Sequence, residues 1–340
     1  MQFTHILLIS LLALSPVLLF ALVLIYLDSF KLVSTARLVM ALLLGAAMTG
    51  ATYFLSGPVM DAFHLDLYPY SRYVAPVLEE CLKASIVIGF ILLNRVGFMI
   101  DAAIIGVAVG AGFAVSENIY YALVFPDANL TVWMIRGVGT AIMHSGTTAI
   151  FGIAAIRHSE RQSMHNPLHY IPGLVGAIAL HAIYNQFIYW PVFSSAVTVF
   201  VLPFIIYLLF EKSEHEAHEW MLHDFESHEH LLEAIRDGSY ANSEAGRFIA
   251  DLARRLPKAH IEDIFAYIRL HTELVLQAEQ MLLARERGER KPRTTATHAD
   301  FARLRALERK IGIVAMLTLW PHLRFNHEEL FELHELEALA

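Results

Sequence analysis

The sequence predicts an all-α protein, in which a polytopic membrane helical bundle of about seven spans precedes a soluble helical domain. Of its 340 residues, 56% are apolar and 17% are charged, and the mean hydropathy is +0.49. Soluble domains carry about 25% charged residues. Residues 1–210 hold 8 Lys and Arg and 9 Asp and Glu, whereas residues 211–340 hold the remaining 17 and 24. This uneven distribution excludes a single soluble globule, and the net charge of -8 argues against nucleic-acid binding by phosphate neutralisation.

Apolar runs of about 20 residues are long enough to cross a bilayer as helices. Such runs occupy about 4–27, 36–56, 72–94, 99–124, 134–157, 168–190 and 193–211. The first run lacks a preceding basic segment and is longer than the apolar core of a signal peptide, so we interpret it as a retained span. We therefore expect a transmembrane domain over residues 1–211 and a second domain over residues 212–340.

Basic residues in short loops predict the orientation, because they mark the cytoplasmic side. They follow the first, third, fifth and seventh runs, as Lys31, Arg37, Arg95, Arg157, Arg161 and Lys212. The alternate loops, at about 57–71, 125–133 and 191–192, contain no Lys or Arg. We expect a multi-pass protein of the plasma (inner) membrane, with an extracytoplasmic N-terminus and a cytoplasmic C-terminal domain.

The third run carries three ionisable residues, Glu79, Glu80 and Lys83. A charged residue at the centre of a span costs about 2.5–3.5 kcal/mol on insertion scales, and it usually faces a bundle interior. Glu79 and Lys83 are four residues apart, so we expect them to pair. Glu80 points about 100° away from Glu79. Pro76, one turn earlier, predicts a kink. A structural ion pair between helices is the alternative interpretation of these charges.

Polar residues also occur in the next three runs. They are Glu117 and Asn118 in the fourth run, Arg136 and His144 in the fifth, and His181 and Asn185 in the sixth. Glu117 has no basic residue within one helical turn, so its partner must come from another span. Gly106, Gly110 and Gly112 precede it in a pattern that predicts close contact with a neighbouring helix.

The depths of these residues agree between runs. With a rise of about 1.5 Å per residue, Glu79 and Glu117 each lie about 10 Å from the outer end of their run. His144 and His181 lie about 14–15 Å from theirs. The sequence therefore predicts one buried polar layer on four consecutive spans, in the outer half of the bilayer.

Paired carboxylates, two histidines and an amide suit hydrolysis. A glutamate can deprotonate water, and Asn185 can donate an N–H to a developing oxyanion. Zinc is the alternative, with Glu79 or Glu80, Glu117, His144 and His181 as ligands. The HisGluXxxXxxHis pattern is absent, and the single cysteine, Cys81, excludes a cysteine-based zinc site. We therefore expect no cofactor, with zinc as the less favoured option.

Other protein classes also bury Glu and His in membranes. An ion-coupled transporter is one alternative, although the two halves of the chain show no inverted repeat. A non-catalytic membrane sensor or immunity protein that signals through its tail is another.

Four short motifs over about residues 72–190 resemble those of the PrsW family of intramembrane proteases, which is similar to CAAX prenyl proteases and bacteriocin-processing membrane proteases. They are Glu79-Glu80-x-x-Lys83, the GlyPheAlaValSerGluAsn stretch ending at Asn118, the stretch from Arg136 to Ser145, and His181 with Asn185. The resemblance implies a metal-independent, glutamate-type peptidase whose catalytic core is this segment.

The resemblance also implies roles. Glu79 matches the water-activating glutamate, and His181 with Asn185 matches an oxyanion-stabilising pair. Glu80, Glu117 and His144 complete the expected catalytic set, and Lys83, Asn118 and Arg136 support it. The implied substrate is a single-span membrane protein such as an anti-sigma factor, cut on its extracytoplasmic side.

The tail is predicted to be helical, with helices near 243–255, 260–287, 298–318 and 326–338. Its acidic surface indicates a solvated face or a site for a cytoplasmic partner. Five histidines crowd its first segment, and His215 and His218 are spaced three apart. We expect a plain polar face there, with a metal site as the alternative.

Overall fold

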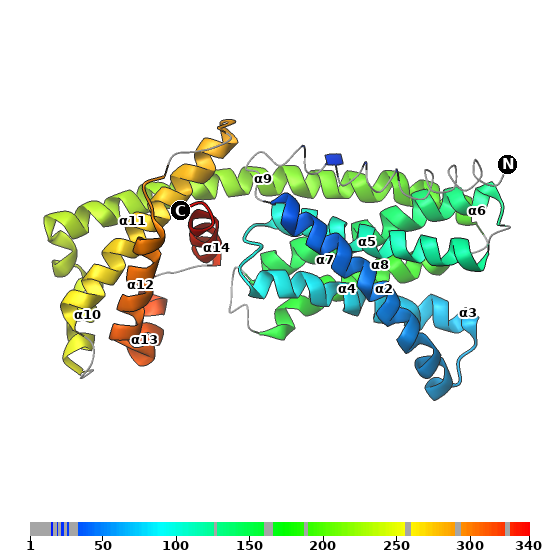
Figure 1. The fold of residues 1–340 in the computed structure, drawn as a ribbon, viewed down its shortest axis with the longest axis horizontal. Coiled ribbons are helices and arrows are strands. Elements are labelled where there is room, and N and C mark those ends of the chain that lie inside the picture. The colour runs from blue at the N-terminus through cyan, green and yellow to red at the C-terminus, as the bar shows by residue number, and fades with distance from the viewer. Residues whose placement is uncertain are drawn as a thin grey trace. The chain divides into compact units, whose positions relative to one another are not determined.

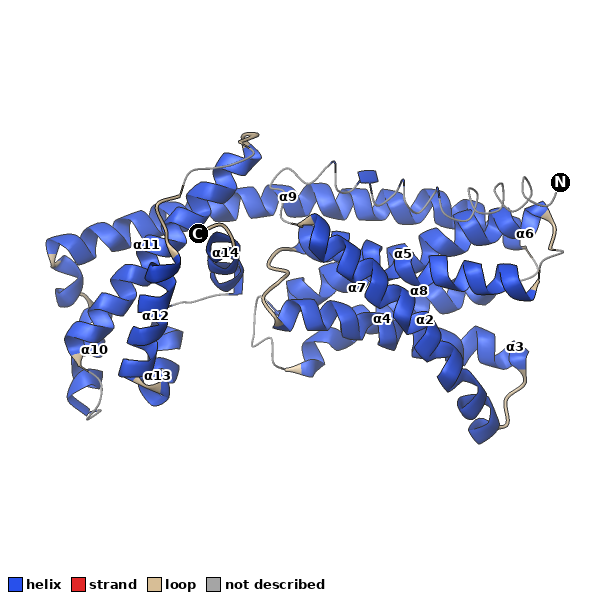
Figure 2. Ribbon diagram, in the orientation of Figure 1, coloured by secondary structure: helices blue, strands red, loops and turns tan. Residues whose placement is uncertain are grey.

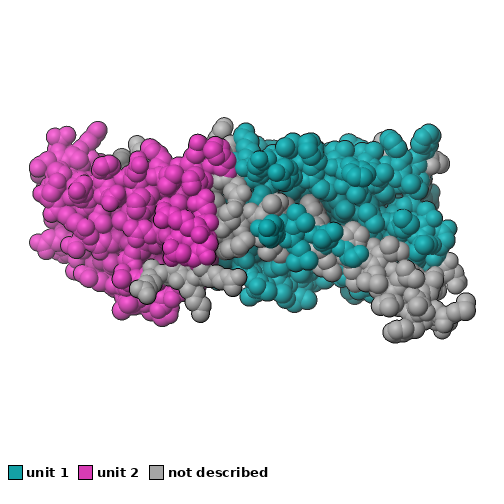
Figure 3. Space-filling model, turned by 90° about the horizontal axis from the view of Figure 1, so that it is seen from above, with its two compact units in different colours: residues 1–214 teal, residues 215–340 magenta. Residues whose placement is uncertain are grey.

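The computed structural model describes residues 33–125, 128–159, 166–186, 190–255, 260–289, 294–323 and 327–340, and the single residues 15, 19, 22, 23 and 26. The predicted span at 4–27, apart from those single residues, and Lys31 and Arg161 lie outside the described residues. Within them, every regular element is a helix and none is a strand (Figure 2). The chain divides into two compact units, residues 1–214 and 215–340 (Figure 3), and each is described by itself.

Unit 1 is a bundle of long helices (Figure 1). They are α2 (Thr35–Phe63), α4 (Ala75–Leu92), α5 (Met99–Val124), α7 (Ala141–Ser159), α8 (Ile171–Gln186) and the first part of α9 (Pro191–Asp237). Four described stretches are long and apolar enough to cross a membrane: Thr35–Phe63, Met99–Val124, Leu130–His158 and Pro191–Ser213. The predicted spans at 72–94 and 168–190 contain helices α4 and α8. However, α4 carries three charges and α8 has only 16 residues.

Short helical segments lead into three of these helices. The segment α3 (Leu67–Pro69) and the π-helix η1 (Tyr70–Val74) precede α4, and η3 (Pro167–Tyr170) precedes α8. The segment α6 (Leu130–Met134) and the π-helix η2 (Ile135–Thr140) precede α7. Pro76 lies in the first turn of α4, which continues directly from the π-helix η1. Because Pro76 has no N–H to donate, the backbone oxygen of Ser71, five residues earlier, accepts a hydrogen bond from Asn185 Nδ2.

Helix α5 packs against α7 on one side and α2 on another, and residues 99–114 are buried along its length. Gly110 permits this contact, because a Cβ there would collide with the backbone of His144 in α7. A Cβ at Gly112 would likewise meet the backbone of Leu42 in α2. The predicted close helix contact is confirmed, and it fixes the position of His144 relative to α5.

Unit 2 contains the end of α9, the short 3₁₀ turn η5 (Ser239–Asn242), and helices α10 (Glu244–Arg255), α11 (Ile261–Glu286), α12 (His298–Ile311), α13 (Ile313–Leu323) and α14 (His327–Glu337). Helix α11 is the core element and packs against α12 and α14. The prediction of one helix over 298–318 is wrong. Gly312 adopts φ 86°, and this left-handed backbone ends α12 and starts a new helix.

Candidate active site

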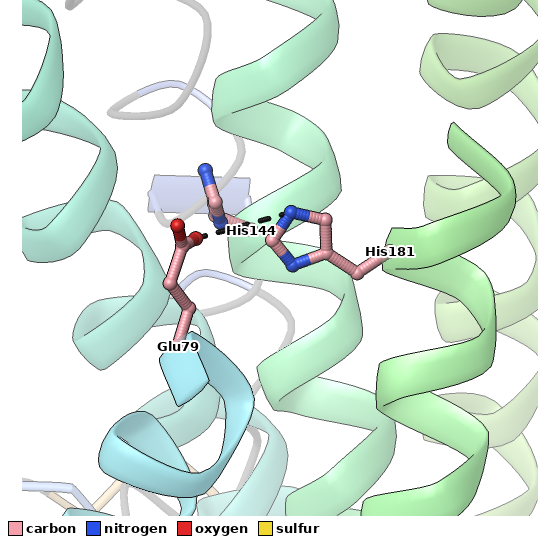
Figure 4. A group of neighbouring side chains, drawn as sticks. All are labelled: Glu79, His144 and His181. Carbon is pink, nitrogen blue, oxygen red and sulfur yellow. Dashed lines mark ion pairs between the residues drawn. The ribbon is translucent and has the colours of Figure 1, made fainter. Parts of the chain in front are cut away.

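The polar residues predicted to form one layer come together in unit 1. Helix α4 supplies Glu79, Glu80 and Lys83, while α7 and α8 supply His144 and His181. All five are buried. Figure 4 shows Glu79, His144 and His181 directed toward one another from α4, α7 and α8. The helices that carry Glu79 and His144 each follow a π-helical segment, an irregularity that is frequent at functional sites.

Glu80 is the most fully paired carboxylate of the site. Its Oε1 accepts from Lys83 Nζ at 2.6 Å and contacts His181 Nδ1 at 2.7 Å. The hydroxyl of Thr147, for which the sequence alone predicts no role, donates to the same oxygen at 3.3 Å. The predicted pairing of Lys83 with Glu79 is therefore wrong. An i,i+3 pair also shares a helix face, and Glu80 is the more deeply buried glutamate, so it has the greater need of a cation.

The contact with Glu80 determines which nitrogen of His181 carries the proton. An ionised carboxylate only accepts, so Nδ1 carries the hydrogen and Nε2 keeps its lone pair. Nε2 lies 3.9 Å from Oε2 of Glu79. This separation is too long for a direct hydrogen bond. It suits one small species between the two atoms, such as a water molecule.

His144 lies between two charged groups. Lys83 Nζ is 3.1 Å from its Nδ1, and Oε2 of Glu117 is 3.2 Å from its Nε2. Arg136, in η2, contacts the same Glu117 oxygen at 3.0 Å. Arg136 is therefore the partner from another span that the sequence of α5 requires. The two ion pairs, Glu80 with Lys83 and Glu117 with Arg136, hold His144 between them.

The two asparagines lie apart from these contacts. Asn185 donates from Nδ2 to the backbone oxygen of Ser71 at 2.9 Å, which ties α8 to η1. Asn118 is buried, and its side-chain oxygen and nitrogen find no hydrogen-bond partner within the described residues. Within these residues, neither amide hydrogen-bonds to the carboxylate–histidine group.

Three of these side chains also form a metal-ligand set. Glu79, His144 and His181 each offer one ligand atom, and these atoms all lie within 4.8 Å of one another. One carboxylate and two imidazoles are a donor set of catalytic zinc sites. Glu80 on Nδ1 of His181 is the kind of outer carboxylate that orients a zinc-binding histidine. The residues therefore fit zinc. Glu117, which the predicted zinc set included, is not one of the three.

One comparison with known proteins gives a match. The family model described as PrsW family intramembrane metalloprotease matches residues 34–210, which is more than half of the chain. The matched range contains α4, α5, η2, α7 and α8, and hence every residue of the site described above. Comparisons with curated proteins and with solved structures give no match.

Proposed function

The chain belongs to the PrsW family, whose model is described as intramembrane metalloprotease. From its membership in this family of intramembrane peptidases and from the site geometry, we propose that it hydrolyses a peptide bond of a single-span membrane protein with water held between Glu79 and His181. As a member of this family, it is a multi-pass membrane protein and an intramembrane peptidase. The observation that supports the proposal most directly is the 3.9 Å separation between Glu79 Oε2 and His181 Nε2, both of which are acceptors.

Each of the two acceptors takes one hydrogen of the attacking water. Glu79 removes a proton as the water oxygen bonds to the scissile carbonyl carbon. The carbon–nitrogen bond then breaks, and the leaving amine takes the proton back from Glu79. His181 orients the water through Nε2, because Glu80 holds its other nitrogen. In this proposal Glu79 is the base and Glu80 is a positioning residue.

The surrounding charges keep this arrangement fixed. Lys83 compensates the buried charge of Glu80, and Arg136 compensates Glu117. Asn185 donates one N–H of its side-chain amide to the backbone oxygen of Ser71. The same nitrogen carries a second N–H. We propose this second N–H as a donor to the oxyanion that forms at the scissile carbonyl.

Zinc is the second option, favoured by the ligand set of Glu79, His144 and His181. A bound zinc ion supplies Lewis-acid polarisation of the scissile carbonyl. Glu79 would then be a ligand and not the base. His144 would exchange its contact with Lys83 or with Glu117 for the ion. The two options predict opposite responses to chelation.

The proposed substrate class follows from the depth and orientation predicted by the sequence. The loop charges and the depths of the residues predict that the carboxylate–histidine layer lies in the outer half of the bilayer. A substrate with one span, cut near its extracytoplasmic end, brings its scissile bond to this depth. A membrane-anchored anti-sigma factor is the proposed example.

Reconstitution of the full chain with a single-span substrate tests the proposal. Wild type should cleave the substrate, and Glu79→Gln should lower the rate by about 10²–10⁴-fold, because it removes the base. Cys81→Ser, two residues away on the exposed face of α4, is the matched control and should cleave like wild type. Cleavage by Glu79→Gln at the wild-type rate would contradict the assignment.

Chelation then separates the two options. Water activated by Glu79 alone predicts unchanged cleavage after treatment with a strong chelator. The zinc option predicts that cleavage stops and returns when zinc is added back.

A further inference from the structure

A second group of acids and histidines lies in unit 2, outside the residues that the family model matches. Helix α9 supplies Asp224 and His228, which are four residues apart and share a face. Helix α11 supplies Glu279, and α14 supplies Glu332 (Figure 1). His228 Nδ1 contacts Glu279 Oε1 at 2.8 Å, so the group joins α9 to α11 within unit 2.

Two histidines share a further carboxylate at this place. Glu329 Oε1 lies 3.9 Å from His228 Nε2, and Glu329 Oε2 lies 4.0 Å from His271 Nδ1. His271 and Glu329 are both buried. Histidines and carboxylates from three helices thus converge on one interior point.

The group contains carboxylate oxygens that make no hydrogen bond to any residue that the structure describes. Glu332 is fully buried, and neither of its oxygens makes a hydrogen bond within the described residues. The same holds for Oε2 of Glu279, which is also fully buried. A buried carboxylate without a partner is costly, because it loses its hydration and gains no compensating contact. These oxygens therefore point to a ligand that provides positive charge.

The neighbours of Glu332 increase this need. Burial raises the pKa of Glu332 well above its usual range, and the charges that add to the effect come from four carboxylates. These are Glu279, Glu329, Asp224 and Glu328. A bound cation near Glu332 would compensate its buried carboxylate in these acidic surroundings.

The geometry of the first three side chains suits a cation. Asp224, His228 and Glu279 each present one ligand atom, and these atoms all lie within 4.8 Å of one another. Mixed imidazole and carboxylate ligands favour zinc, manganese or iron, whereas calcium and magnesium prefer oxygen alone. We propose that unit 2 binds a divalent transition-metal ion through Asp224, His228 and Glu279, with Glu332 as a further ligand. This site is separate from Glu79, His144 and His181, and it does not depend on the proposed peptidase mechanism.

Metal content of the full chain tests the proposal. Purified protein in detergent is dialysed against zinc or manganese, and bound metal is measured by mass spectrometry. His228→Gln removes the imidazole ligand, and Glu332→Gln replaces the carboxylate with an amide of the same shape. Each should weaken binding in unit 2 by at least about tenfold. The control is the pair His230→Gln and Glu229→Gln, exposed on the same helix, and each should bind metal like wild type.

Removing the possible metal ligands of unit 1 makes the measured metal content specific for unit 2. In a Glu79→Gln/His181→Ala background, only the site in unit 2 should retain metal. Binding of about one ion per chain in this background, lost on addition of His228→Gln, supports the proposal. The proposal is wrong if the Glu79→Gln/His181→Ala protein binds no metal. It is also wrong if His228→Gln and Glu332→Gln bind as much metal as His230→Gln and Glu229→Gln. Either result would mean that the buried acids of unit 2 are protonated instead of metal-bound. A wild-type melting temperature that rises with zinc, while that of Glu332→Gln does not, supports it independently of metal counting.

Discussion

The two buried polar groups of this protein differ in how their charges are compensated. In unit 1, Glu80 contacts Lys83, His181 and Thr147, and Glu117 contacts Arg136. In unit 2, Glu332 has no partner for either oxygen within the described residues. Both groups lie in helical interiors where an unpaired charge is costly. The difference indicates a preassembled network in unit 1 and an incomplete ligand set in unit 2.

The comparison also shows how reactive atoms are distinguished from supporting ones. Glu80 and Glu117 have close cationic partners, so among the three carboxylates of the unit 1 site Glu79 has the longest contact, at 3.9 Å. Its neighbour across this gap is the free nitrogen of His181. A network that satisfies all but one carboxylate leaves that carboxylate available for water or a metal.

The largest expected effect comes from breaking the compensated pair in unit 1. Lys83→Met leaves Glu80 with an uncompensated buried charge and should lower the free energy of unfolding by about 3–5 kcal/mol. Adding Glu80→Gln removes that charge, so Glu80→Gln/Lys83→Met should recover part of the loss. Unfolding in sodium dodecyl sulfate, followed by circular dichroism, measures both. Equal stability of Lys83→Met and wild type would show that the pair contributes nothing.

A second test disturbs the packing that positions the network. Gly110→Val places side-chain atoms against the backbone of His144, because α5 and α7 are in close contact there. The overpacking should cost about 1–3 kcal/mol and shift His144 away from Glu117. We expect a loss of cleavage larger than the loss of folded protein. Gly50→Val, at an exposed position of α2 where a Cβ meets no atom within 4 Å, is the matched control and should change neither measurement.

In unit 2, replacing a charged residue should increase stability, whereas Lys83→Met in unit 1 should decrease it. Glu332→Met removes the unpaired carboxylate and should stabilise the metal-free protein by about 1–3 kcal/mol. Thermal unfolding in the presence of a chelator measures this change. Lower stability of Glu332→Met under these conditions would mean that the carboxylate already has a stabilising partner.

The smallest expected effect concerns the hydrogen bond at the edge of the unit 1 site. Asn185→Ala removes the contact with Ser71 and should lower stability by about 1 kcal/mol. If Asn185 also stabilises the oxyanion, the rate of cleavage should fall by much more than this stability change explains. A fall in rate that matches the loss of folded protein would restrict Asn185 to tying α8 to η1.

The sequence by itself determined the helical class and most helix positions, because apolar length and turn residues are local signals. Helix α5 begins and ends at the predicted residues 99 and 124. The ends of α10 and α11 lie within one residue of the prediction. It missed the break at Gly312, because a glycine within a helical pattern does not reveal its backbone angle.

The set of polar residues in the membrane part was also readable from sequence, because an ionisable residue in an apolar run stands out against its neighbours. Which of them touch was decided by tertiary structure alone. The spacing of four residues favoured Glu79 as the partner of Lys83. In the structure Glu80 is more deeply buried, and it is Glu80 that contacts both Lys83 and His181. The group of acids and histidines in unit 2 was not predicted for the same reason, because contacts between helices cannot be read from the sequence. Asp224, Glu279 and Glu332 lie on charged helices that read as solvated faces, and only the packing of α9, α11 and α14 makes them buried neighbours.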